Sequence, residues 1–116
     1  MSNQPTTKLR TYSLDKIIVI EMDGNIQQGE SDELEELLYS LYEDQHLKMI
    51  INLERVSNIC STALGLLVRF KSFLNERGGD LKIVMNSPRV FELFKITMLD
   101  KVFETMDNMQ EAVNAF

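Results

Sequence analysis

The fold class is decided by the stretch Met49-Ile50-Ile51-Asn52-Leu53-Glu54-Arg55-Val56-Ser57-Asn58-Ile59-Cys60-Ser61-Thr62-Ala63-Leu64-Gly65. Its first five residues form a nearly continuous apolar run, the pattern of a central strand that is covered on both faces. A loop is expected from Glu54 to Cys60, followed by a helix from about Thr62 to Arg77 that ends at Gly78-Gly79. A strand that leads through a loop into a helix is the repeating unit of a parallel sheet.

Two strands and one helix are predicted before this stretch. Leu9–Leu14 alternates weakly and Lys16–Met22 is rich in β-branched residues, so Asp15 between them predicts a hairpin. Ser31 or Asp32 can cap the helix that follows, whose apolar residues recur with the spacing of one buried stripe. That stripe consists of Leu34, Leu37, Leu38, Leu41 and Tyr42.

Shorter elements are predicted after it. Leu81–Met85 forms the next strand, and Ser87-Pro88 places a cap residue before a proline at the start of a short helix. The buried side chains of that helix are expected to be Val90, Phe91 and Phe94. A brief strand near Val102-Phe103 precedes a last helix, in which Asp107 and Gln110 have capping-box spacing.

This order of elements predicts an α/β fold. We expect a mostly parallel sheet of four to five strands, an antiparallel edge strand and about four helices. Residues 1–116 form a single domain in this interpretation, because no repeat or linker divides the chain, and residues 1–7 are expected to be a flexible tail.

Composition excludes several classes of function. The chain has 116 residues, and its 18 acidic and 12 basic side chains give a net charge of -6, which is unfavourable for binding nucleic acid. A single cysteine cannot form an internal disulfide or a cysteine-rich zinc site. Apolar runs such as Ile17–Ile20 are too short for membrane insertion, and no targeting signal is found, so a cytoplasmic protein without a cofactor is expected.

Candidate functional residues follow the carboxyl ends of the predicted parallel strands, where sites of such sheets usually form. The loops there are Asp23–Ser31, Glu54–Ser61 and Asn86–Arg89. The middle loop places Ser61 and Thr62 at the start of a helix. Either hydroxyl can act as a simple helix cap, or it can accept a phosphate that the positive end of the helix dipole tolerates.

The same residues resemble the signature of STAS domains, and specifically of bacterial anti-sigma factor antagonists. In that family an apolar strand ending in Asn/Asp-Leu is followed by Val and by a segment Asp-Ser-Ser/Thr-Gly-Leu-Gly, which corresponds here to Ile50–Gly65. The resemblance continues through Gly78-Gly79, Leu81–Met85 and Ser87–Val90 to Leu99–Phe103. Cys60 stands where the family usually has Asp, and Ala63 where it usually has Gly.

The resemblance implies partner switching without catalysis by this chain. In the family, the unphosphorylated protein binds an anti-sigma factor with serine kinase activity, phosphorylation ends that binding, and a PP2C-type serine phosphatase resets it. Carried onto this sequence, the phosphate acceptor is Ser61, with Thr62 as the second choice. The partner-binding residues are then expected to be Gln27, Asn58, Cys60, Thr62, Ser87 and Arg89.

Other interpretations stay open at this point. A relative of the family can act as an adaptor in a transport or sensory assembly without being phosphorylated, and Glu21, Asp23 and Glu54 could hold a metal in a small enzyme. The thiol of Cys60 has no cationic or histidine neighbour in sequence, which favours packing over reactivity, and His46 is expected at the opposite edge of the sheet. Phe91 and Met98 are further candidates for a partner surface, if their side chains are exposed.

Overall fold

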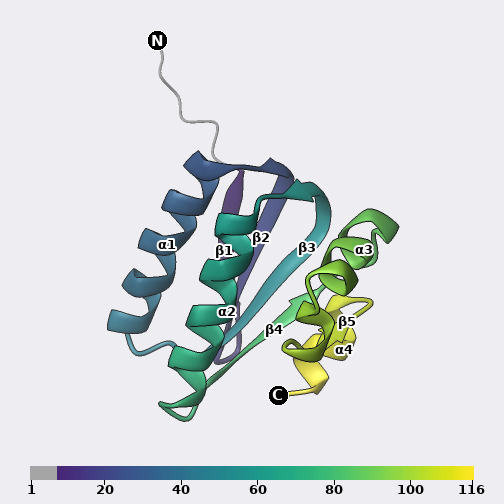
Figure 1. Cartoon of the computed structure of the whole chain (residues 1–116). Coiled ribbons are helices and arrows are strands. Elements are labelled where there is room, and N and C mark those ends of the chain that lie inside the picture. The colour runs from purple at the N-terminus through teal and green to yellow at the C-terminus, as the bar shows by residue number, and fades with distance from the viewer. Residues whose placement is uncertain (1–7) are drawn as a thin grey trace.

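Strand β3 (Lys48–Ile59) is the middle strand of a five-stranded sheet with the order β1-β2-β3-β4-β5 (Figure 1). β1 (Leu9–Leu14) pairs antiparallel with β2 (Ile17–Ile26). β2, β3, β4 (Asp80–Val84) and β5 (Thr105–Met106) pair in parallel. The α/β architecture with an antiparallel edge strand is therefore confirmed.

The computed structural model describes residues 8–116, so the tail expected at residues 1–7 lies outside the described residues. Four α-helices accompany the sheet: α1 (Gln28–Glu43), α2 (Ser61–Asn75), α3 (Pro88–Ile96) and α4 (Met109–Asn114). A short 3-10 helix, η1 (Leu99–Lys101), follows α3. In the described part of the chain, no helix combines the length and the apolar character that crossing a membrane requires.

The two faces of the sheet are covered unequally. α1, α2 and α3 contribute to the larger core cluster on one face, and α4 contributes to a smaller cluster on the other (Figure 1). Along β3, Met49, Ile51 and Leu53 face the larger cluster, whereas Ile50 faces the smaller one. Except for Asn52, the central run is apolar because both faces are buried, and each buried apolar side chain contributes about 1.5–3 kcal/mol to stability.

The predicted loop from Glu54 to Cys60 is wrong, because β3 continues as strand to Ile59. It stays paired with the long strand β2, which has 10 residues to the 12 of β3, and the last pair is Ile26 with Ile59. Two register shifts, on either side of the pairs that Asp23 and Gly24 form, each give β3 one more residue than β2. Gly24 has a φ of 77° at this point. The pairing partner thus extends a strand whose own sequence looks like a loop.

Two predicted helix starts are also wrong. α1 begins after Gln27, not after Ser31 or Asp32, and the Glu30 carboxylate accepts a hydrogen bond from the Gln27 N–H (2.8 Å). α4 is capped by Asn108, whose side chain accepts from the Glu111 N–H (2.9 Å), one residue later than the predicted pair Asp107 and Gln110.

The last strand lies at Thr105–Met106 and not at Val102-Phe103. Phe103 is buried against Phe94, with ring centroids 6.0 Å apart, and Val102 is exposed. Phe91 is also exposed, in contrast to the prediction, whereas Val90 and Phe94 are buried as expected.

Candidate functional site

The site is built where β2 and β3 end side by side. The Cys60 N–H donates to the carbonyl oxygen of Ile26 (2.9 Å), which ties the residue after β3 to the last residue of β2. α2 begins at the next residue, Ser61. A strand thus passes into a helix with a single residue between them, so the position of Ser61 is set by backbone bonds on both sides.

Cys60 is the N-cap residue of α2. Its backbone is extended (φ −77°, ψ 160°), and no side-chain hydrogen bond caps the helix. The expectation that the Ser61 or Thr62 hydroxyl forms the cap is therefore wrong. The Cys60 side chain is half-buried and packs against the larger core cluster, which fits the prediction of a packing role.

Ser61 and Thr62 are both exposed in the first turn of α2. The backbone N–H groups of a first turn have no partner within the helix, and here no side chain of the described residues caps them. The positive end of the helix dipole is consequently uncompensated at Ser61. An anionic group on this hydroxyl would lie in a favourable field.

Ala63 follows on the opposite side of the same turn. Its side chain is completely buried. Where the family usually has glycine, the Ala63 methyl group fills space in the core. The backbone at this position does not have a positive φ, so alanine fits it without strain.

Gln27 and Asn58 lie at the same edge as Ser61. The register that pairs Asn25 with Asn58 and Ile26 with Ile59 brings Gln27 level with Cys60. Gln27 is exposed, and its N–H bond to Glu30 holds it at the start of α1 and lowers the pKa of that carboxyl group. The structure thus brings together Gln27, Asn58, Cys60, Ser61 and Thr62.

Ser87 and Arg89 lie lower on the sheet. The last pair between β4 and β3 is Val84 with Asn52, seven residues before Ile59 at the end of β3. Ser87 is the N-cap residue of α3, and Arg89 is exposed in the first turn of that helix. These two residues form a second group beside the first, at the start of a different helix.

The acidic residues considered for a metal site each have another partner. Glu21 accepts from Arg10 (Nη2 to Oε1, 2.9 Å), Asp23 lies 3.5 Å from the Nε atom of Arg55, and Glu54 accepts from Asn86 (3.1 Å). Within residues 8–116, no three side chains of His, Cys, Asp or Glu converge to hold a metal ion. The structure does not assemble the proposed metal site.

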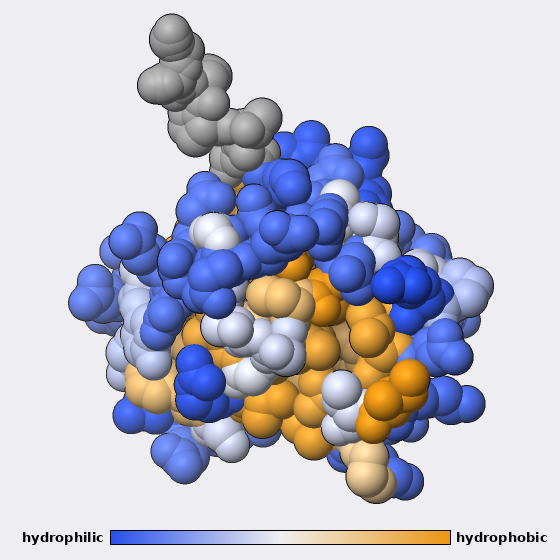
Figure 2. All heavy atoms as spheres, turned by 45° about the horizontal axis from the view of Figure 1, so that its top comes forward, coloured by the Kyte–Doolittle hydropathy of each residue, from blue (hydrophilic) through white to orange (hydrophobic). Residues whose placement is uncertain are grey.

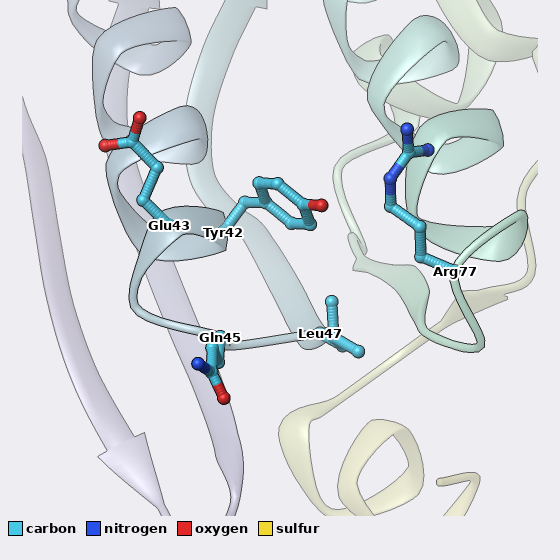
Figure 3. A pocket seen from close by; sticks show the side chains of 5 residues that line it. All are labelled: Tyr42, Glu43, Gln45, Leu47 and Arg77. Carbon is cyan, nitrogen blue, oxygen red and sulfur yellow. The ribbon is translucent and has the colours of Figure 1, made fainter.

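A hollow that the sequence did not indicate lies at the opposite edge, between the ends of α1 and α2 (Figure 3). It has a volume of about 360 Å³ and is lined by Tyr42, Glu43, Gln45, Leu47 and Arg77. The Arg77 guanidinium stacks on the Phe73 ring, 3.7 Å from its centroid, and donates to the Phe73 carbonyl oxygen (2.9 Å). Figure 3 shows Glu43 and Gln45 pointing away from Arg77, so polar groups do not converge there. His46 also lies at this edge, as predicted.

Residues 8–112 match the family model of the STAS domain. The chain belongs to the STAS domain family. The resemblance identified from Ile50–Gly65 is thereby confirmed.

Among proteins of known name, this STAS domain is similar to the anti-sigma-B factor antagonist of Staphylococcus aureus, with 35% identity over 91 residues that cover 78% of this chain and 84% of the relative. Among solved structures, it is similar to a protein from Thermotoga maritima, with 18% identity, a TM-score of 0.86 and 92% of both chains covered.

The phosphorylated form of the Bacillus cell fate determinant SpoIIAA has a TM-score of 0.73 and 17% identity, with 92% of this chain and 97% of that chain covered. At this level of identity, the structural matches establish the fold.

Proposed function

We propose that this STAS domain is an anti-sigma factor antagonist that acts by partner switching. In its unphosphorylated form it binds an anti-sigma factor with serine kinase activity, and phosphorylation of Ser61 releases that partner. A PP2C-type serine phosphatase restores the binding form. The name of the Staphylococcus aureus relative supports the role, and SpoIIAA, a protein of the same fold, has been solved in a phosphorylated form.

The observation that carries this proposal is the position of Ser61. Its hydroxyl is exposed on the first residue of α2, where no side chain of residues 8–116 caps the helix. A phosphate there adds about -1.5 to -2 charges against the positive end of the dipole, which the fold tolerates. A partner packed on this edge would have to desolvate or pair the same charge, so it is released.

The binding edge proposed for the partner has two parts. Gln27, Asn58, Cys60 and Thr62 surround Ser61, and Ser87 and Arg89 extend the surface toward α3. Cys60 replaces the usual Asp of the family with a half-buried thiol, so a kinase must recognise Ser61 without that carboxylate.

The first experiment tests phosphorylation. The full chain is incubated with ATP and the kinase encoded next to its gene, and the phosphosite is mapped by mass spectrometry. We expect phosphate on Ser61 in the wild type and none on that peptide in Ser61→Ala, while Thr62→Ala is still modified.

The second experiment measures binding of the same kinase by calorimetry. A phosphate on Ser61 should weaken binding about a thousandfold, which corresponds to about 4 kcal/mol. Ser61→Asp should weaken it in the same direction, and Ser72→Asp serves as a control because it adds the same charge near the other end of α2. If neither Ser61 nor Thr62 is modified and Ser61→Asp binds like the wild type, the switch is refuted and the adaptor role is favoured.

A further inference from the structure

The segment of α3 and η1 exposes most of the large apolar side chains on the described surface. Of seven such residues, four lie between positions 91 and 102. They are Phe91 (37% exposed), Ile96 (72%), Met98 (57%) and Val102 (42%). A cluster of this kind on a small domain marks an interaction surface more often than scattered single residues do.

Met98 is held outward by its backbone. Its φ of 62° and ψ of 20° lie in the left-handed region, which residues other than glycine rarely adopt. The Met98 N–H donates to the Lys95 carbonyl oxygen (3.1 Å), and the Met98 carbonyl oxygen accepts from the Lys101 N–H (3.2 Å). A left-handed residue directly after the C-cap, here Thr97, is a common way for an α-helix to end, and at this place it leaves an apolar side chain in water.

The outward face of α3 has a regular pattern. Val90 and Phe94 point into the core and are fully buried. Helical geometry then places Glu92 and Lys95 near the centre of the exposed face, with Phe91 on one flank and Ile96 on the other. A shallow hollow of about 550 Å³ on this face is lined by Pro88, Phe91, Glu92 and Lys95.

The two central charges have no ion-pair partner within residues 8–116, where the salt bridges involve neither Glu92 nor Lys95. Both side chains are exposed. Glu92 and Lys95 lie three positions apart on one helix face. In an antiparallel copy of this face, the lysine of one chain would therefore lie opposite the glutamate of the other.

The net charge of the molecule lies away from this face. α1 contains six acidic residues and no basic one, so the other 12 acidic residues balance the 12 basic ones. α1 lies on the opposite side of the molecule from α3 (Figure 1). In Figure 2 the α1 side is largely hydrophilic, and apolar atoms gather from the centre toward the α3 side.

We propose that the face formed by α3 and η1 binds a second copy of this chain, in a twofold dimer with the two α3 helices antiparallel. A twofold axis passing between Leu93 and Phe94 places Glu92 level with Lys95 of the partner subunit. The same axis keeps Phe91 on the flank that carries Phe91 of the partner subunit, and Ile96 on the flank that carries Ile96 of the partner subunit. The acidic α1 helices then lie at the two outer ends of the dimer, where their repulsion is smallest.

The size of the face sets the expected strength. α3 has nine residues and η1 has three. A standard interface uses roughly 20–30 residues a side, more than these two helices supply, so a reversible dimer with a Kd of about 10–100 μM is expected. This association does not involve Ser61, but Arg89 of the proposed binding edge lies on the same helix, so the dimer is tested on the chain alone, without the kinase.

The experiment is sedimentation equilibrium of the full chain between about 5 and 500 μM, a range that brackets the expected Kd. The mean mass should rise from 13.4 kDa toward twice that value. Glu92→Lys and Lys95→Glu should each weaken the dimer at least about tenfold, because each sets like charges opposite one another. The double variant Glu92→Lys/Lys95→Glu should restore it, because the opposite charges face each other again.

Two controls keep the result interpretable. Melting followed by circular dichroism should show that all variants fold, and Asp107→Lys, a charge reversal outside α3 and η1, should leave the association unchanged. A mass of 13.4 kDa at every concentration overturns the proposal, as does a double variant that fails to recover. If the chain stays monomeric and Ile96→Ser weakens binding of the kinase, the face belongs to that partner and not to a second copy.

Discussion

Gly79 joins α2 to β4 where the chain passes close to the segment that precedes β3. Its N–H donates to the Leu74 carbonyl oxygen (2.8 Å), and a Cβ atom at this position would overlap the carbonyl oxygen of Leu47. The Leu47 carbonyl oxygen also accepts a hydrogen bond from the Asp80 N–H (3.0 Å), so it cannot move away without weakening that bond. Gly29, in the first turn of α1, has no heavy atom within 4 Å of its Cβ position.

The two glycines should therefore respond oppositely to alanine. Gly79→Ala should lower the free energy of unfolding by about 1–3 kcal/mol, because the backbone must shift to admit the methyl group. Gly29→Ala should raise it by up to about 1 kcal/mol, since alanine is the better helix former. Urea unfolding of both variants measures the difference, and equal effects would contradict this account of the Leu47 contact.

At the residue scale, the sequence predicted that Ser61 lies at the start of a helix, and the structure places it there with its hydroxyl exposed. Its choice as phosphate acceptor came from the resemblance over Ile50–Gly65. The N-cap could not be predicted, because cysteine is not a preferred cap residue and Cys60 holds the position through its backbone bond to Ile26. The role of Ser61 as phosphate acceptor stays a prediction.

At the element scale, β4 is anchored by a network of charges. Lys82 is almost fully buried, with its Nζ atom 2.6 Å from Glu104, 3.2 Å from Asp80 and 4.9 Å from the Phe116 ring centroid. Lys71 of α2 lies 2.6 Å from the other oxygen of Asp80. β4 is thereby connected to α2, to the segment before β5 and to the last residue of the chain.

The pKa of Asp80 follows from these contacts. Burial raises it, but hydrogen bonds from Lys71, from the Leu81 N–H and from Lys82 outweigh burial and lower the pKa below its usual value. For Lys82, burial lowers the pKa, but the hydrogen bonds to Glu104 and Asp80 outweigh burial, so the pKa of Lys82 is raised above its usual value. The Asp80 contribution to stability is present above about pH 4 and is lost as the pH falls through its folded pKa. The contribution of Lys82 to stability is lost as the pH rises through the folded-state pKa of Lys82, above about pH 10.

Asp80→Asn should lower the free energy of unfolding by about 1–3 kcal/mol at pH 7, because it leaves Lys82 with Glu104 alone. The gap between variant and wild type should narrow as the pH falls below about 4, where Asp80 of the wild type becomes protonated. Asp100→Asn, at an exposed position of η1, is the control. Urea unfolding at several pH values tests this, and a gap that stays constant would exclude the carboxylate as the cause.

Element types were largely predictable, and element ends were not. The hairpin, the stripe of α1 and the apolar run of β3 follow local patterns that tertiary contacts only reinforce. The end of β3 depends on pairing with β2, and the last strand depends on pairing with β4. The burial of Lys82 depends on partners that are distant in sequence, so no local pattern reports it.

At the scale of the whole molecule, the concentration of charge on α1 should make stability depend on salt. Glu36 lies three and four positions after Glu33 and Asp32, so like charges face each other along the helix. The melting temperature of the wild type should rise with NaCl, because salt screens this repulsion. Glu36→Lys should stabilise the protein by about 0.5–1 kcal/mol at low salt and reduce the salt dependence.

Calorimetry from low to high NaCl measures both effects. Asp107→Lys makes the same change in net charge outside α1 and should not stabilise the protein. A melting temperature that falls with salt would show that attractive pairs, such as Arg10 with Glu21, outweigh the repulsion on α1.

The strand order β1-β2-β3-β4-β5 is also the order of synthesis. Each strand pairs with the one made just before it, and no strand has to be inserted between two that are already paired. The sheet can therefore grow from one edge as the nascent chain leaves the ribosome. α4 follows all five strands in the chain, so the apolar face formed by Ile17, Val19 and Ile50 stays uncovered until α4 has been made.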